Sequence, residues 1–405
     1  MPALRVLLDA TAVPAARGGV GRYVEELAAV LQHEVELVIA CQRRDREVFT
    51  ARAPRAELAV LPGWADPRPV RLLWEQFGLP LVARRLRVDV IHSPHYTMPL
   101  LAGRPVAVTL HDALFFSDRE WHTGLKARFF RSWIKLSLRR AAVCVVDSAA
   151  TGDELVRLAG ADRDQLVVAH LGVDPARFHP PSTAEVSAAA ASLELDDRGW
   201  IAFLATHEPR KNVPALVDGF VRSCTDRPDP PVLVLAGGAG WDTRIDGAIA
   251  AVPDHLTVLR PGYLPLSVLS GYLGGATVVA YPSLGEGFGI PVLEGMACGA
   301  AVLTTDRLSL PEVGGDAVAY TEPDGPAIGA ALDTLLDDPH LRSELAARAV
   351  RRAADFTWDG CAQSCLAAYR TAVAGRRGRG IRGRGSRRLG GRRLGSRWRT
   401  AGGAG

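Results

Sequence analysis

The sequence contains almost no lysine, no long apolar run and no paired cysteines. Only Lys126, Lys135 and Lys211 are lysines among 405 residues, a preference for arginine that a GC-rich genome explains without any function. No run of about 18 or more uninterrupted apolar residues occurs, so we expect no membrane-spanning helix. The first residues lack a basic region followed by a long apolar core, which indicates a first strand and not a signal peptide. We therefore expect a cytoplasmic protein.

The six cysteines are scattered along the chain, and none forms a C-x-x-C pair. In a cytoplasmic protein this pattern favours reduced thiols over disulfides. Cys361 and Cys365 would share one helix face. Because no third metal ligand lies near them in the sequence, core packing is favoured over a metal site.

The formal net charge of +4 hides an asymmetry. From Gly375 to the C-terminus there are eleven arginines and no acidic residue, so the rest of the chain would carry −7. This segment has too little apolar content to bury itself, and we expect 375–405 to be a disordered tail. Binding of RNA or anionic lipid through its charges is the alternative to a solvated tail.

Alternating strand and helix patterns occur twice along the chain, which is typical of parallel sheets covered by helices. We therefore predict an α/β protein with two Rossmann-like domains, over 1–180 and 195–354. A last helix over 355–373 could cross back to the N-terminal domain. The predicted strands cover 4–9, 34–40, 89–92, 105–110, 143–148 and 165–169, and then 200–205, 232–236, 256–259, 276–281 and 301–304.

The segment from Glu286 to Glu294 carries the strongest functional pattern. It follows a predicted strand, and its glycines and Pro291 indicate a tight turn before a helix. Glu286 is thus placed at the carboxyl end of a strand, where open α/β sheets bind ligands. One carboxylate for sugar hydroxyls, amides for phosphate and a second carboxylate for a ribose would make a nucleotide-sugar site; two solvated glutamates around a turn is the alternative. The amides that could face an anion belong to Phe288, Gly289 and Ile290.

Arg210 and Lys211 stand just before a helix predicted at 214–224, which Asn212 could cap. Two cations beside a helix N-terminus favour phosphate binding over a solvated pair.

Two stretches of the N-terminal half also place polar groups at strand ends. His111 follows a strand beside Asp112, which favours a ligand-facing role over a structural one. Gly19 lies in a glycine loop after the first strand. Because the third glycine of a dinucleotide fingerprint is missing, we expect this loop to approach a diphosphate or an acceptor, with a plain tight turn as the alternative.

The stretch 121–140 interleaves aromatic and basic residues. Such a helix can lie on an anionic membrane, or it can pack its aromatic side in the core and solvate its charges, and the sequence favours neither. Asp162 and Asp164 form a D-x-D string, which in some transferases binds a metal. Its place in a short turn before a strand favours simple solvation.

As a set, these motifs resemble those of the family-four glycosyltransferases, which have the GT-B fold. The resemblance spans residues 1 to about 373, and it is specific as a set although each motif is weak alone. Around Trp74-Glu-Gln76 and Glu208 to Asn212 the chain is most similar to bacterial mannosyltransferases of cell-surface polysaccharide synthesis. The matching motifs are Gly18-Gly-Val-Gly-Arg-Tyr23, His111-Asp112, Gly172-Val-Asp174, Glu208-Pro-Arg-Lys-Asn212, Gly262-Tyr263, Pro282-Ser283, Glu286 to Glu294, and Leu310-Pro-Glu-Val313.

The resemblance implies two domains that face each other across a cleft, and sugar transfer from a nucleotide-diphosphate donor with retention of anomeric configuration. The donor would lie mainly on the C-terminal domain and the acceptor mainly on the N-terminal domain. The catalytic residues it implies are His111 facing the sugar, Glu286 on the sugar hydroxyls, and Arg210 and Lys211 on the diphosphate. The donor-binding residues it implies are Gly19, Tyr263, Phe288, Gly289, Ile290 and Glu294, the last on the ribose.

No metal or other cofactor is expected, because the two cations and helix dipoles would stabilise the leaving diphosphate. The favoured donor is GDP-mannose, and the acceptor would be a glycan, a lipid-linked sugar or a small molecule. Peripheral membrane contact could occur, and nucleic acid is not an expected partner.

The chain departs from the family pattern in two places. It reads Ala205-Thr-His207 where many members have Gly-Arg, and Gly295 and Gly299-Ala-Ala301 replace the commoner Ala and Gly-Thr-Pro residues. The arginine tail has no counterpart in the family pattern. The alternatives are a GT-B nucleotide-sugar epimerase, and a non-catalytic protein that binds nucleic acid or membrane through its tail.

Overall fold

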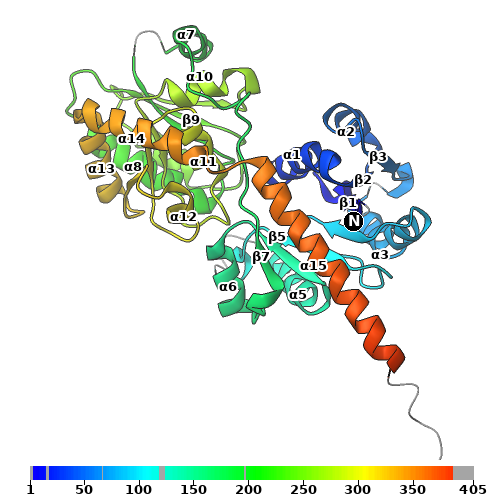
Figure 1. Ribbon diagram of the computed structural model, residues 1–405. Coiled ribbons are helices and arrows are strands. Elements are labelled where there is room, and N and C mark those ends of the chain that lie inside the picture. Colours follow the sequence, from blue (N-terminus) through cyan, green and yellow to red (C-terminus); the bar gives the residue numbers. More distant parts are fainter. Residues whose placement is uncertain (1–2, 15–17, 66, 118–123, 196–197, 386–405) are drawn as a thin grey trace, which may run out of the picture.

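The computed structural model describes residues 3–14, 18–65, 67–117, 124–195 and 198–385. It contains two α/β domains, each built on one parallel sheet, that face each other in Figure 1. The predicted α/β fold class is therefore confirmed. The predicted loop residues 15–17, the start of the predicted helix at 121–123 and the tail segment 386–405 lie outside the described residues.

The N-terminal sheet has the strand order β3-β2-β1-β4-β5-β6-β7, and all its printed pairings are parallel. Leu7 of β1 pairs with Val38 of β2 on one side and with Ile91 of β4 on the other. The sequence patterns missed β3, a short edge strand with no fully buried position. The strands are β1 (Arg5–Asp9), β2 (Glu36–Cys41), β3 (Glu57–Val60), β4 (Val90–Ser93), β5 (Val106–Leu110), β6 (Val143–Val146) and β7 (Leu166–Val168).

The C-terminal sheet has the order β10-β9-β8-β11-β12-β13, again parallel. Here the two-residue strand β13 escaped the sequence patterns. The strands are β8 (Trp200–Leu204), β9 (Val232–Ala236), β10 (Val258–Gly262), β11 (Val278–Tyr281), β12 (Val302–Thr304) and β13 (Ala319–Tyr320).

Helices cover both faces of each sheet, as the apolar strands require. In the N-terminal domain, one face packs on α3, α5 and α6, and the other packs on α1, α2 and the last helix, α15. The helices of this domain are α1 (Gly19–Glu34), α2 (Arg46–Arg52), α3 (Arg68–Arg85), α4 (Leu114–Ser117), α5 (Gly124–Arg140) and α6 (Ala149–Ala159). Those of the C-terminal domain are α7 (Thr183–Ser192), α8 (Val213–Cys224), α9 (Ile245–Ala250), α10 (Leu269–Gly274), α11 (Ile290–Ala297), α12 (Leu310–Gly314), α13 (Gly325–Asp337) and α14 (Pro339–Ala353).

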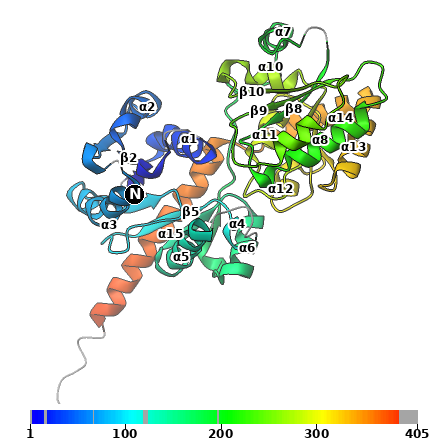
Figure 2. The ribbon, with the colours of Figure 1, turned by 180° about the vertical axis from the view of Figure 1, so that it is seen from behind.

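Helix α15 (Trp358–Gly385) leaves the C-terminal domain and packs against the N-terminal one (Figures 1 and 2). The Tyr369 hydroxyl lies 2.8 Å from Nδ1 of the buried His92 of β4. The predicted end near Val373 was too early, because the helix continues to Gly385, into the segment expected to be disordered. Arginine is a good helix former, and a helix whose first turns are packed is easily extended.

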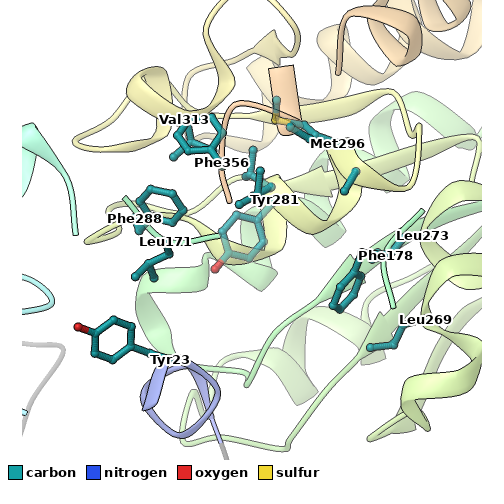
Figure 3. Close-up of a cluster of buried hydrophobic side chains, with 14 of the residues drawn as sticks. Tyr23, Leu171, Phe178, Leu269, Leu273, Tyr281, Phe288, Met296, Val313 and Phe356 are labelled. Atoms are coloured by element: carbon teal, nitrogen blue, oxygen red, sulfur yellow. The ribbon is translucent and has the colours of Figure 1, made fainter. Parts of the chain in front are cut away.

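A buried apolar cluster joins the two domains (Figure 3). Tyr23 of α1 and Leu171 lie near Phe288 and Phe356, which belong to the second half of the chain. The rings of Phe288 and Phe356 are 5.7 Å apart. The facing ends of the two sheets are thus held by a shared core.

Candidate functional site

The reversal of strand order in the C-terminal sheet lies between β8 and β11. Ligands bind outside the carboxyl ends of strands at such switch points. Arg210 and Lys211 follow β8, whereas Glu286 follows β11. The fold therefore brings together at one switch point three residues that the sequence separates.

Glu286 is buried and has four polar neighbours. One carboxylate oxygen, Oε1, accepts hydrogen bonds from Lys211 Nζ at 2.7 Å, Tyr281 Oη at 2.9 Å and Ser283 Oγ at 2.6 Å. The other oxygen pairs with the Arg210 guanidinium. The family resemblance implies that Glu286 binds sugar hydroxyls and that the cations bind the diphosphate. In the structure these residues bond to each other, because buried charges need partners.

The protonation of this cluster follows from burial and pairing. Burial alone would raise the pKa of Glu286, but Arg210 and Lys211 outweigh it and lower this pKa to about 2. Burial and the charge of Arg210 lower the pKa of Lys211 to about 8, against the pull of Glu286. Burial also disfavours the charged form of Arg210, yet Glu286 and Glu208 raise its pKa overall. At neutral pH the site thus holds one carboxylate between two cations.

The predicted capping role of Asn212 is wrong. Asn212 does precede α8, but its backbone is left-handed with φ of 60° and its side chain makes no cap hydrogen bond. Instead the side-chain amide donates to the carbonyls of Pro282 at 3.3 Å and Pro323 at 2.7 Å. Asn212 ties the loop after β8 to two other loops of the domain.

The turn between Glu286 and α11 has the geometry that its glycines predict. Gly289 has φ of +106°, which favours glycine, and α11 begins at Ile290 with Pro291 in its first turn. The Ser309 hydroxyl lies 2.8 Å from the Glu286 carbonyl and 2.9 Å from the Phe288 carbonyl, which fixes the loop. The Phe288 side chain is buried against Phe356, so only its backbone could face a ligand.

Gly287 brings the site into direct contact with the N-terminal domain. A Cβ at this position would lie 1.8 Å from the His111 carbonyl oxygen, so only glycine fits. The Gly287 carbonyl accepts hydrogen bonds from Ser148 Oγ at 2.7 Å and Thr151 Oγ1 at 3.0 Å. His111 and the loop that starts at Glu286 are therefore neighbours, as the predicted site requires.

The His111 ring is held at both nitrogens. Nδ1 lies 2.8 Å from the Asp147 carboxylate and Nε2 lies 2.7 Å from the Pro94 carbonyl. Burial lowers the pKa of His111, but Asp147 and the Pro94 carbonyl raise it more, and the net shift is upward. Both ring nitrogens are thus held by oxygen atoms, and it is the backbone carbonyl of His111 that a Cβ at Gly287 would meet.

Of the remaining predicted residues, two lie at the domain boundary and one lies apart from the Glu286 cluster. Gly19 opens α1 beside α11, since a Cβ on Gly19 would lie 3.7 Å from Ile290 Cδ1. Glu294 is buried in α11 and forms an ion pair with Arg22 of α1 across the domain boundary. Tyr263 follows β10, is 73% exposed, and lies against Gly238, so it is not brought into the Glu286 cluster.

Sequence reasoning missed three residues that lie around the site or between the two domains. Asp147 directly follows β6, and its place after a strand was the available signal. Arg22 stands inside the quoted glycine motif but was given no role. Glu312 of α12 accepts from the amides of Ala149 at 2.8 Å and Ala150 at 3.1 Å, at the N-terminus of α6 in the other domain.

A second buried cluster that sequence reasoning missed lies at the switch point of the N-terminal sheet, between β1 and β4. Arg71 of α3 donates to Glu75 at 2.8 Å, and the Thr97 hydroxyl donates to the same oxygen at 2.9 Å. Burial and the nearby carboxylate of Asp9 raise the pKa of Glu75 to about 7, although Arg71 opposes this. This cluster faces the same end of the molecule as His111.

Among the described residues, no three His, Cys, Asp or Glu side chains are grouped closely enough to hold a metal ion. Within that same part of the chain, every helix is too short or too polar to cross a membrane.

Two family models match the chain. Glycosyltransferase Family 4 covers residues 17–177, and Glycosyl transferases group 1 covers residues 188–353. The O-antigen chain mannosyltransferase B of Escherichia coli is 30% identical over 283 residues, which are 69% of this chain and 74% of that protein. The D-inositol 3-phosphate glycosyltransferase of Jonesia denitrificans is 32% identical over 347 residues, which are 80% of this chain and 76% of that protein.

The fold comparison agrees with the sequence comparison. The crystal structure of Anabaena HepE in complex with UDP-glucose matches with a TM-score of 0.71 and 16% identity, over 89% of this chain and 97% of that one. At this identity the likeness shows the fold alone. Taken with the family models and the mannosyltransferase relative, it establishes that the chain belongs to the family-four glycosyltransferases with the GT-B fold and is a hexosyltransferase.

Proposed function

We propose that this enzyme moves a hexose, with mannose favoured, from a nucleoside-diphosphate donor to a glycan or lipid-linked acceptor, with retention of anomeric configuration. The observation that carries the proposal is the buried contact of Glu286 with Arg210 and Lys211 at the C-terminal switch point. A diphosphate that entered there would take over bonds from both cations, and the released carboxylate would then be free to accept from sugar hydroxyls.

Other features support the same assignment. Glu294 pairs with Arg22 of the other domain, and a ribose could replace the guanidinium as its partner. The cations would stabilise the leaving diphosphate, so the proposed reaction needs no metal ion. The mannosyl preference rests on the relative that is named an O-antigen chain mannosyltransferase, and cell-envelope polysaccharide or glycolipid synthesis is the proposed setting.

The test is a donor panel with nucleoside-diphosphate release as the readout. GDP-mannose, GDP-glucose, UDP-glucose and UDP-N-acetylglucosamine are each incubated with and without a mannosyl acceptor, in EDTA. We expect acceptor-dependent release with GDP-mannose, and an α-linked product by NMR. Conversion of the donor sugar without any acceptor would instead identify an epimerase, and release that requires added divalent metal would refute the metal-free mechanism.

A further inference from the structure

The outer side of α3 carries an apolar stripe. Leu73, Phe77 and Leu81 are 61%, 67% and 67% exposed, and their spacing of four residues puts them on one helix face. Trp64, 67% exposed, lies just before the helix, and Leu101, 81% exposed, lies in the loop after β4. Single exposed apolar residues are ordinary, but a contiguous set of large ones marks a contact surface.

A surface hollow of about 920 Å³ opens beside this stripe. Phe77 and Leu81 form one wall and Leu100 and Leu101 form the other. Its volume is in the range of small-molecule sites, and its walls are mainly apolar. The hollow and the stripe therefore form one continuous apolar surface on the N-terminal domain.

The charges around this surface have a single sign. Arg84 of α3, Arg104 before β5 and Arg140 at the end of α5 line the hollow. Within the described ranges no carboxylate lies within 4 Å of these three arginines. The acidic residue of α3, Glu75, is buried on the opposite side of the helix and bonded to Arg71. An apolar centre with a cationic rim matches the chemistry of an anionic lipid surface.

The arginine-rich end of the chain is a separate source of attraction to anionic surfaces. Helix α15 packs on the sheet face opposite α3, and its last turns project beyond the N-terminal domain (Figures 1 and 2). From Gly375 to the C-terminus the sequence has eleven arginines and no acidic residue.

We propose that the outer face of α3 docks on an anionic phospholipid bilayer. Leu73, Phe77 and Leu81 enter the interface, and the arginines around the hollow bind headgroup phosphates. A second copy of the chain fits this surface less well. In a two-fold dimer the same patch meets itself, so the arginines of both copies would be brought together. The proposal depends on the proposed function in one respect only: the docked surface would present a lipid-linked acceptor to the enzyme.

Helix α5, which the sequence also offered as a membrane helix, is less suitable. The ring of Phe130 stacks on Phe115 at 4.6 Å, inside the domain. The ammonium of Lys126 lies 5.7 Å from the ring of Trp241, which belongs to the C-terminal domain. Leu125 and Phe129 remain exposed on α5, which makes them a matched control for the α3 stripe.

The experiment is vesicle co-sedimentation of the full chain, with phosphatidylglycerol or phosphatidylcholine vesicles, at 0.1 M and 0.5 M NaCl. High salt screens the arginine tail, so the salt-resistant binding reports apolar insertion. We expect the wild type to bind phosphatidylglycerol at both salt concentrations. The triple variant Leu73→Ser, Phe77→Ser, Leu81→Ser should lose the salt-resistant binding by about tenfold or more, whereas Leu125→Ser with Phe129→Ser should not.

Three results would overturn docking through α3. Two of them are equal salt-resistant binding of the triple variant and the wild type, and equal losses in both variants. A third is a wild-type dimer by light scattering that the triple variant converts to monomer without a change in vesicle binding. Transfer to a soluble acceptor and the melting temperature are measured in parallel. If the wild type bound vesicles but transferred no sugar, the result would count against the proposed function and would leave the docking surface unaffected.

Discussion

The two switch points of the molecule are built alike but charged differently. In the C-terminal domain, Arg210, Lys211 and Glu286 are all ionised at neutral pH. In the N-terminal domain, burial raises the pKa of Asp9, and burial together with the charge of Asp9 brings the pKa of Glu75 to about 7. At neutral pH the C-terminal site therefore carries two cations, whereas the N-terminal site can gain or lose a proton.

This difference suits the two substrates of a transferase. Two cations suit the diphosphate of a nucleotide sugar, which stays ionised near neutral pH. A neutral acceptor hydroxyl needs hydrogen-bonding groups and no net charge, which a protonatable carboxylate bonded to arginine and threonine can provide. Under the proposed function, one architecture would serve an anionic donor and a neutral acceptor through different groups at its two switch points.

The largest effect should come from breaking the C-terminal site. Lys211→Ala removes a buried cation from the proposed diphosphate site, and we expect transfer to fall about a thousandfold, or ~4 kcal/mol of transition-state stabilisation. The control is Lys126→Ala, a lysine outside the site that we expect to change kcat/KM less than about twofold. Comparable rates for the two variants would remove Lys211 from the mechanism.

The N-terminal site should reveal itself in stability against pH. The folded-state pKa of Glu75, about 7, lies above its ordinary value of 4.5, so the fold keeps a proton that the unfolded chain has lost. Its stabilising contribution is therefore full below pH 4.5 and disappears as the pH rises to 7, by up to about 3 kcal/mol. Urea unfolding at a series of pH values should show this loss in the wild type and not in Glu75→Gln. An unchanged slope in that variant, matching the exposed control Glu47→Gln, would show that folding does not raise the pKa of Glu75.

A smaller effect should separate the two sites by their response to alkali. Because the pKa of Lys211 is about 8, a growing fraction of this cation is lost above that pH. We expect affinity for a nucleoside diphosphate to fall by about tenfold between pH 8 and pH 9.5 in the wild type. Lys211→Arg stays charged and should keep a flat profile. If both proteins lost affinity in parallel, the titrating group would lie elsewhere.

The smallest effect concerns the contact that holds the sites together. Glu312→Gln weakens the carboxylate bonds to the amides of Ala149 and Ala150 and to His170, whose Nε2 lies 2.6 Å away. We expect kcat/KM to fall several-fold, about 1 kcal/mol, with little change in melting temperature. Glu344→Gln, which removes an exposed contact to Arg348, is the control. A Glu312 variant with unaltered kinetics would mean that this contact between the domains does not contribute to transfer.

Where sequence and structure agree, the information is local. The strand, the glycine turn and the helix around Glu286 to Glu294 are contiguous, so periodicity and turn chemistry predicted them. The two-domain α/β architecture follows from the same repeated pattern. The edge strands β3 and β13 are short and weakly patterned, and they were missed for that reason.

Where they differ, the partner lies far away in the chain. Asn212 matches a helix cap locally, but carbonyls of Pro282 and Pro323 capture its side chain. The pairing of Glu294 with Arg22 joins the two domains, and no spacing rule encodes it. Glu75 could be read as part of a motif, but its buried environment depends on strands and helices that only the fold assembles.

The most direct test of the account is calorimetric binding of GDP and UDP to three proteins: wild type, Lys211→Ala and Glu75→Gln. We predict that the wild type binds at least one of them with micromolar affinity, that Lys211→Ala weakens this binding at least about a hundredfold, and that Glu75→Gln leaves it unchanged. Binding that survives in Lys211→Ala but is lost in Glu75→Gln would place the nucleotide on the N-terminal domain. That result would contradict the proposal that the donor binds at Arg210 and Lys211 and the acceptor binds beside Glu75.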